Sequence, residues 1–207
     1  MTYRAPVDDI VFALKTAAGL PELVANGIVE VDEDTVTAVI EEAGRFASEV
    51  LDPLNVPGDR IGSRLVDGKV EPPPGWKEAY TAFAEGGWSA LPCPPEYGGQ
   101  GLPEMVSMAA CEIWNSANLS FGLCPLLTQG AIDALALHGS DVLKATYLPK
   151  MISGEWTGTM NLTEPHAGSD LGHLTCKAVK QADGTYRVFG TKIFITYGDH
   201  ELTENII

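Results

Sequence analysis

The sequence is poor in positive charge. Thirteen Lys and Arg residues stand against 28 Asp and Glu, which gives a formal net charge of −15 at pH 7. A surface of this sign repels phosphate backbones and anionic headgroups, so neither nucleic acid nor an anionic membrane is expected as a partner. No apolar run approaches the roughly 20 residues that cross a bilayer, so no membrane span is expected.

Cysteines are also few, and they lack the spacing of metal or redox sites. The four are Cys93, Cys111, Cys124 and Cys176, and no two form a Cys-x-x-Cys pair. Because a His-x-x-x-His pair is missing too, we expect no metal site. The first residues lack the apolar core of a secretory signal. A cytoplasmic protein with reduced thiols is therefore expected.

The first three quarters of the sequence predict helices. Between Val36 and Leu51, apolar residues recur at steps of three and four, the period of an amphipathic helix. Pro53 is expected to end that helix. Shorter patterns of the same kind, joined by Gly and Pro turns, predict further helices at 7–18, 76–84, 105–113, 126–138 and 142–148. We expect an all-α domain over residues 1–155.

From Trp156 onward the hydrophobic period changes to two. Strands are predicted at 156–162 and 192–196, and a hairpin at 177–189 turns at Asp183-Gly184. Three or four strands with open edges do not complete a core. Residues 156–207 are therefore expected to be part of a β-domain, and the chain is expected to be a fragment cut inside that domain. The predicted fold class is α+β.

Two polar segments lie in this second part. The first is Met160-Asn-Leu-Thr-Glu-Pro-His-Ala-Gly-Ser-Asp170, whose small residues leave backbone N–H groups accessible to a bound group. The second is Gly190-Thr-Lys-Ile-Phe-Ile-Thr196. Taken singly, Thr163 could be a turn residue and Phe194 a core residue.

Together the two segments resemble the signatures of the FAD-dependent acyl-CoA dehydrogenase family. A loop at 94–101 resembles the family's Pro-x-x-Tyr-Gly-Gly-x-Gly motif. The resemblance implies a helical N-terminal domain, with residues 1–30 as an extension, followed by the start of a β-barrel domain. The family's C-terminal helical bundle would be absent from this chain.

The resemblance implies FAD as the cofactor. Thr163 would donate its hydroxyl near flavin N5, and Ser169 would contact both the diphosphate and the CoA side of the substrate. Residues 194–196 would cover the ring. The full set implied to bind the cofactor is Met160, Leu162, Thr163, Gly168, Ser169, Phe194, Ile195 and Thr196.

The implied reaction oxidises an acyl-CoA thioester to its trans-2-enoyl form. A carboxylate removes the α-proton and the β-carbon passes a hydride to flavin N5. The family's base is a glutamate in its C-terminal part, and neither Glu112 nor Glu164 matches it. No catalytic residue is therefore expected in this chain, which alone would be inactive. The helix around 123–127 is expected to line part of the acyl pocket.

The resemblance further implies electron-transfer flavoprotein as the acceptor and a homodimer or homotetramer. Two alternatives stay open: an acyl-CoA oxidase that uses oxygen, and a family-like flavoprotein without dehydrogenase activity. A hydrolase using Ser169, His166 and Asp170 is disfavoured because the Gly-x-Ser-x-Gly elbow is missing. His200 is expected at the surface. Acyl chain length is left open.

Overall fold

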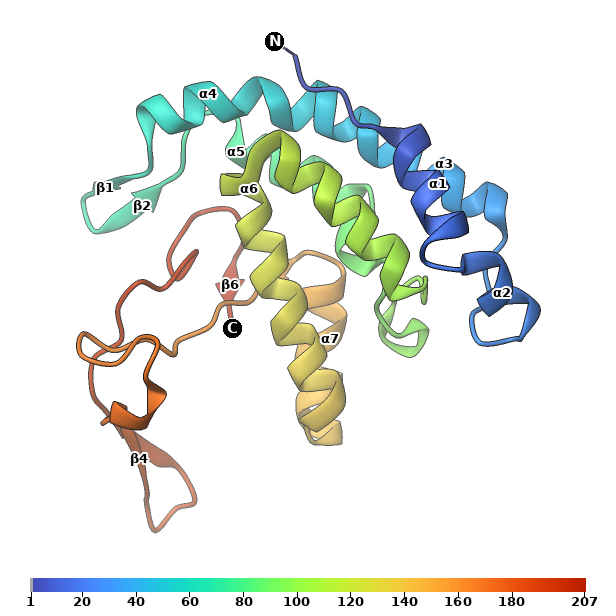
Figure 1. Ribbon diagram of the computed structural model, residues 1–207. Helices are drawn as coiled ribbons and strands as arrows, with labels where there is room; N and C mark the ends of the chain where they lie inside the picture. Colours follow the sequence, from blue (N-terminus) through green and yellow to red (C-terminus); the bar gives the residue numbers. More distant parts are fainter. Residues whose placement is uncertain (1) are drawn as a thin grey trace.

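The computed structural model describes residues 2–207 and shows a helical body followed by an extended, largely irregular segment (Figure 1). The helices of the body are α1 (Val7–Thr16), α2 (Leu20–Ala25), α3 (Glu33–Phe46), α4 (Asp52–Ile61), α5 (Trp76–Glu85), α6 (Glu104–His138) and α7 (Asp141–Ile152). Shorter turns are the π-helical η1 (Ala47–Leu51) and the 3-10 turns η2 (Trp88–Ala90), η3 (Pro95–Tyr97) and η4 (Leu171–His173). The strands are β1 (Arg64–Val66), β2 (Lys69–Glu71), β3 (Trp156–Thr157), β4 (Lys177–Lys180), β5 (Tyr186–Phe189) and β6 (Asn205–Ile206).

Aromatic side chains of α5 and α6 form the centre of the main core. Phe83 packs edge-on against Trp114 at 5.0 Å and against Phe121 at 5.9 Å between ring centroids. Trp88 meets Trp114 at 5.3 Å. Edge-to-face pairs of this kind add about 0.5–1.5 kcal/mol each beyond the area they bury. This cluster packs α6 against α5.

Helix α6 runs through the middle of the body (Figure 1). It contacts α1, α3, α4 and α7, so several of its faces are apolar. By length and composition alone it would also pass for a membrane span. Core helices of soluble proteins have the same character, and this one packs against four neighbouring helices.

Helix α6 replaces two helices that the sequence predicted separately at 105–113 and 126–138. Asn118 interrupts it with non-helical angles (φ −156°, ψ 86°) and is fully buried. The Asn118 side chain donates to the Leu51 carbonyl at 3.2 Å and accepts from the Phe121 N–H at 3.1 Å. Pro125, which lacks an N–H, follows inside the second half. Both predicted helical segments are present, but they belong to one element that is kinked at Asn118.

The prediction that Pro53 ends a helix was wrong. The chain passes from α3 through η1 directly into α4, where Pro53 sits in the first turn and needs no N–H partner. The helix ends instead at Gly62, whose φ of 68° takes it out of the helical region. The helices predicted at 7–18 and 76–84 are confirmed as α1 and α5. The predicted cap Ser140 accepts from the Leu143 N–H at the start of α7, but α7 continues through Pro149, the predicted end, to Ile152, and α2 was not predicted.

The second part of the chain contains two two-stranded sheets, β3–β6 and β4–β5, and residues 2–207 form no closed barrel; the β1–β2 hairpin lies within the helical part. The predicted hairpin is confirmed, with Lys177 opposite Phe189 and Lys180 opposite Tyr186. The strand predicted at 156–162 shrinks to β3, which pairs in parallel with β6.

The strand predicted at 192–196 does not form. Phe194 and Tyr197 both take positive φ values, 56° and 51°, which no β-strand accommodates. His200 was predicted at the surface and is instead 8% exposed, hydrogen-bonded to Thr157 of β3. Tertiary hydrogen bonds therefore override the local alternation in this segment.

Candidate functional site

The structure brings the two polar segments together. The Ile193 N–H donates to the Thr163 carbonyl at 3.0 Å, and Lys192 Nζ donates to the Leu162 carbonyl at 2.8 Å. The Thr159 hydroxyl donates to the Thr196 carbonyl at 2.7 Å. Residues 159–164 and 192–196 therefore lie side by side, as a shared binding site requires.

Glu164 fastens this arrangement. Its Oε1 accepts from the Cys176 N–H at 3.0 Å and from Lys192 Nζ at 2.9 Å, while its Oε2 accepts from the N–H and hydroxyl of Thr175. Hydrogen bonds from Cys176, Thr175 and Lys192 hold the pKa of Glu164 well below its ordinary value. The carboxylate is only 2% exposed and ionised, so its oxygens serve the fold and are not free to take a proton.

Hydrogen-bond donors along the joined segments have no partner in the chain. Within residues 2–207, the backbone N–H groups of Leu162, Thr163, Gly168, Ser169 and Thr196 make no hydrogen bond. The same holds for the side-chain hydroxyls of Thr163 and Ser169. A Cβ at Gly168 would meet nothing nearer than Thr163 Cγ2 at 3.9 Å, so the space above it is open. This set of donors fits a ligand with several acceptor atoms, such as a flavin and its diphosphate.

The apolar residues predicted to cover a flavin stand beside these donors. Phe194 is 85% exposed and Met160 is 60% exposed, while Ile195 is half-buried. Neither large side chain is used in packing the chain's own core. Both therefore remain available to a bound ring.

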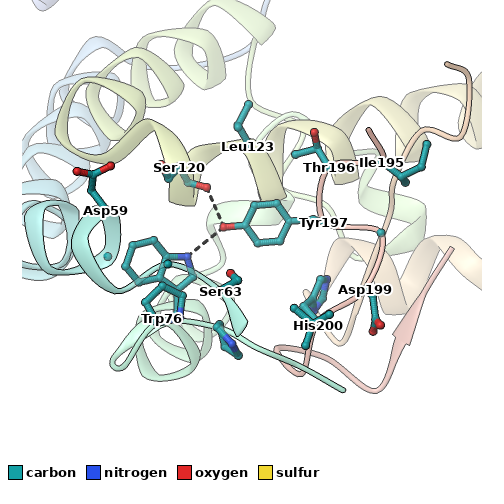
Figure 2. A pocket seen from close by; sticks show the side chains of 16 residues that line it. Asp59, Ser63, Trp76, Ser120, Leu123, Ile195, Thr196, Tyr197, Asp199 and His200 are labelled. Atoms are coloured by element: carbon teal, nitrogen blue, oxygen red, sulfur yellow. Dashed lines mark hydrogen bonds between the residues drawn. The ribbon is translucent and has the colours of Figure 1, made fainter. Parts of the chain in front are cut away.

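A cavity of about 580 Å³ adjoins the second segment (Figure 2). Leu123, from the helical stretch expected to line an acyl pocket, is in its wall. Tyr197 crosses the cavity: its hydroxyl donates to the Ser120 carbonyl at 2.7 Å and accepts from Trp76 Nε1 at 3.0 Å. Tyr197 was not predicted as a site residue from the sequence, although it directly follows Thr196.

His200 lies at another side of the same cavity. Its Nδ1 accepts from the Leu202 N–H at 3.1 Å, so the proton of the neutral ring is on Nε2, which faces Thr157 Oγ1 at 3.1 Å. Burial lowers the pKa of His200, an effect that the nearby charge of Asp199 partly opposes. The charged side chains in the cavity wall, Asp59 and Asp199, are both acidic.

Two other chemistries lack the necessary geometry. The His166 ring is bonded to the His173 carbonyl at 3.0 Å, and no hydrogen bond within residues 2–207 joins Ser169 to His166 or Asp170. A hydrolytic triad is therefore not assembled there. Among the same residues no group of His, Cys, Asp and Glu side chains could hold a metal ion.

Comparison with known proteins assigns the family. The family model described as Acyl-CoA dehydrogenase, N-terminal domain, matches residues 33–155. The chain belongs to the acyl-CoA dehydrogenase family, which confirms the resemblance found in the two polar segments.

Curated relatives match over essentially the whole chain. A 3-methylmercaptopropionyl-CoA dehydrogenase of Ruegeria pomeroyi is 55% identical over 208 residues, covering 100% of this chain and 35% of the relative. A butyryl-CoA dehydrogenase of Syntrophomonas wolfei is 33% identical, covering 99% and 34%. A broad-specificity linear acyl-CoA dehydrogenase of Mycobacterium tuberculosis is 35% identical, covering 99% and 34%. The chain thus spans about a third of the length of these relatives.

Solved structures share the fold. The butyryl-CoA dehydrogenase of Megasphaera elsdenii superposes with a TM-score of 0.69 at 23% identity, covering 82% of this chain and 42% of that one. An acyl-CoA dehydrogenase of Bacillus anthracis, solved in complex with FAD, gives 0.65 at 26% identity, covering 81% and 28%. A chain from work on the electron transferring flavoprotein of Acidaminococcus fermentans gives 0.69 at 25%, covering 82% and 41%. The FAD complex agrees with the cofactor expected from the sequence.

Proposed function

We propose that the complete gene product carrying this chain is an FAD-dependent acyl-CoA dehydrogenase, and that this chain supplies one side of its flavin and acyl site. The observation that carries the proposal is the set of unpaired donors on the two polar segments, 160–170 and 190–196, which hydrogen bonds hold side by side next to a cavity of about 580 Å³. A cofactor with many acceptor atoms and an apolar acyl tail fit such a pair of features.

Individual residues have separate roles in this proposal. The N–H groups of Leu162 and Thr163 and the Thr163 hydroxyl would hold the flavin, and Gly168 and Ser169 would hold its diphosphate. When bound, FAD supplies the acceptor for the hydride that leaves the β-carbon. Ser169 would also contact the CoA side of the substrate. These residues bind and orient, and the exposed ring of Phe194 excludes water from the face it covers.

The proton acceptor lies elsewhere in this proposal. Glu164 is buried and accepts four hydrogen bonds, so its carboxylate is already occupied. Glu112 is exposed on α6 and does not line the cavity. We therefore assign the removal of the α-proton to a carboxylate outside residues 2–207, leaving a trans-2-enoyl thioester as the product.

The exposed hairpin supports a larger β-domain. Both faces of β4 and β5 are exposed, and Tyr186, Val188 and Phe189 are 57%, 77% and 48% exposed. An isolated two-stranded hairpin is marginal in water, and apolar residues on both of its faces gain stability only when covered. We propose that further strands cover it and complete the family's barrel, in a cytoplasmic homo-oligomer.

The name of the most similar curated relative discussed above suggests the substrate. Its 55% identity extends over the whole chain, whereas the relatives named for butyryl and linear acyl groups share 33% and 35%. A short acyl-CoA with a thioether in its tail, such as 3-methylmercaptopropionyl-CoA, is therefore our first candidate. Straight-chain acyl-CoA is the second.

An absorption spectrum of the complete gene product, purified without added cofactor, tests the proposal. We expect a yellow protein that bleaches under anaerobic conditions with the thioether substrate at lower concentration than with butyryl-CoA. Reoxidation by electron-transfer flavoprotein, and not by oxygen, would separate a dehydrogenase from an oxidase. A yellow protein that no acyl-CoA bleaches would support a flavoprotein without this activity. A colourless protein that takes up no FAD would refute the proposal.

A further inference from the structure

Tyr197 joins three parts of the chain that are distant in sequence (Figure 2). Its hydroxyl donates to the Ser120 carbonyl of α6 at 2.7 Å and accepts from Trp76 Nε1 of α5 at 3.0 Å. Burial raises the pKa of Tyr197 to about 12, so the hydroxyl keeps its proton and keeps donating at physiological pH. The segment that follows Thr196 is thus tied to two core helices.

The backbone that carries Tyr197 is strained. Phe194 and Tyr197 have φ values of 56° and 51°, a region that bulky side chains seldom adopt. The Gly198 N–H donates to the Ile195 carbonyl at 3.1 Å and closes a tight turn over residues 195–198, which includes Tyr197. Strained conformations persist only where surrounding contacts hold them, and they gather at functional sites. The two bonds of the Tyr197 hydroxyl are contacts of this kind.

The partners of Tyr197 are themselves rigid. The Trp76 ring is 3% exposed, meets Phe121 at 6.4 Å, and lies so close to Gly58 that a Cβ there would overlap it. Ser120 lies between the kink at Asn118 and Pro125 in α6. Tyr197, Trp76 and Ser120 all line the cavity, so the hydroxyl fixes the distance between its loop wall and its helical wall.

We propose that Tyr197 is a positioning residue that determines acyl-chain specificity. Through its hydroxyl it holds residues 194–196 at a set distance from α6, and so it limits how deep an acyl tail can enter the cavity. This inference rests on the proposed function, because it takes the acyl tail to be the ligand of the cavity. The hydroxyl itself need not touch the reacting atoms.

The test is the Tyr197→Phe variant of the complete, FAD-loaded gene product, assayed with straight-chain acyl-CoA from short to long. Phe keeps the ring and removes both hydrogen bonds. We expect kcat/KM for the preferred length to fall about three- to tenfold, mainly through KM, while longer substrates lose little or gain. The preference between chain lengths would therefore flatten. A shift of the visible flavin band would accompany it, because residues 194–196 are freed.

Two further variants sharpen the result. Tyr147→Phe removes the hydroxyl of a tyrosine on α7 that does not line the cavity, and should leave the chain-length profile unchanged. Trp76→Phe removes the donor to Tyr197, so its effect on the profile should not add to that of Tyr197→Phe in the double variant. A Tyr197→Phe protein that melts earlier but keeps the wild-type profile and flavin band would overturn the inference. Failure of every acyl-CoA to bleach the wild type would instead overturn the proposed function.

Discussion

Glu164 accepts four hydrogen bonds from Thr175, Cys176 and Lys192, residues that follow it by 11 to 28 positions. Two of these bonds come from backbone N–H groups, so the carboxylate replaces pairing that a regular strand would give. Its side chain is 1% exposed, as is typical of a charge that is fully paired. At the residue scale, this one glutamate holds the donor-rich segments in register.

Replacing this carboxylate should therefore loosen the site. In Glu164→Gln the amide keeps the shape but loses the negative charge that faces Lys192. We expect the melting temperature to fall by about 5 °C and FAD to dissociate more readily, as measured by thermal unfolding and by flavin retention on a desalting column. Glu78→Gln, at an exposed position of α5, is the matched control and should change neither. Equal flavin retention in the two variants would contradict the role assigned to Glu164.

His200 gives a pH dependence of known sign. Its pKa lies below the ordinary 6.5 because the ring is buried. The stabilisation by neutral His200 is therefore complete above about pH 6.5 and is lost as the pH falls toward the folded-state value. Nδ1 of neutral His200 accepts a hydrogen bond from the Leu202 N–H. Protonation would add a hydrogen to Nδ1, so this hydrogen bond would be lost and two N–H groups would face each other.

We expect the melting temperature to decrease between about pH 7 and about pH 5.5, and this decrease to be smaller in His200→Gln. His138→Gln, at the exposed end of α6, controls for the loss of a histidine elsewhere and should keep the wild-type slope. A His200→Gln protein with the same slope as the wild type would show that other groups cause the dependence.

At the scale of elements, the kink in α6 depends on one buried amide. Asn118 supplies a donor to Leu51 and an acceptor to Phe121 where the helix loses its own bonds. Leaving such groups unpaired in the core costs about 1–3 kcal/mol. We expect Asn118→Ala to lower the free energy of unfolding by about 2 kcal/mol in urea titrations. Asn55→Ala, exposed on α4, should be nearly neutral. A neutral Asn118→Ala would mean that α6 simply straightens.

Element prediction succeeded where burial alone sets the pattern. Val36, Ile40, Ala43 and Leu51 were placed on one helical face, and all four are buried. Prediction failed at Pro53 because proline is common both just after the end of a helix and in the first turn of a helix. The sequence alone does not distinguish these two positions. The 192–196 strand failed for another reason, since its backbone is set by Tyr197 and its bonds to residues far away in the sequence.

Some residues of the candidate site could be predicted from the sequence, and others could not. The family motifs predict Thr163, Ser169 and Thr196 as site residues, and the structure places their segments together. Tyr197 was missed because its role depends on Trp76 and Ser120, which lie 121 and 77 positions away. A sequence motif records which residues are local to a ligand, and the contacts that hold those residues in place come from the tertiary fold.

At the scale of the whole molecule, the two exposed hairpins differ in their expected surroundings. Val188 on β5 is 77% exposed and Leu65 on β1 is 76% exposed, so they are a matched pair. If further strands cover the β4–β5 hairpin, Val188→Asp buries a charge in the complete gene product, whereas Leu65→Asp leaves one in solvent. We expect Val188→Asp to lower the melting temperature by several degrees, about 4–8 °C, and Leu65→Asp to change it little.

Comparing Val188→Asp with Leu65→Asp also distinguishes a β4–β5 hairpin covered by further strands from one that projects into solvent. Flavin retention should fall with Val188→Asp, because Cys176 lies next to β4 and donates to the Glu164 that anchors the donor segments. Limited proteolysis of the wild type should spare the turn at Asp183-Gly184 if it is covered. Rapid cleavage there, with Val188→Asp as stable as Leu65→Asp, would mean that the hairpin projects into solvent and that the β-domain is completed around other residues.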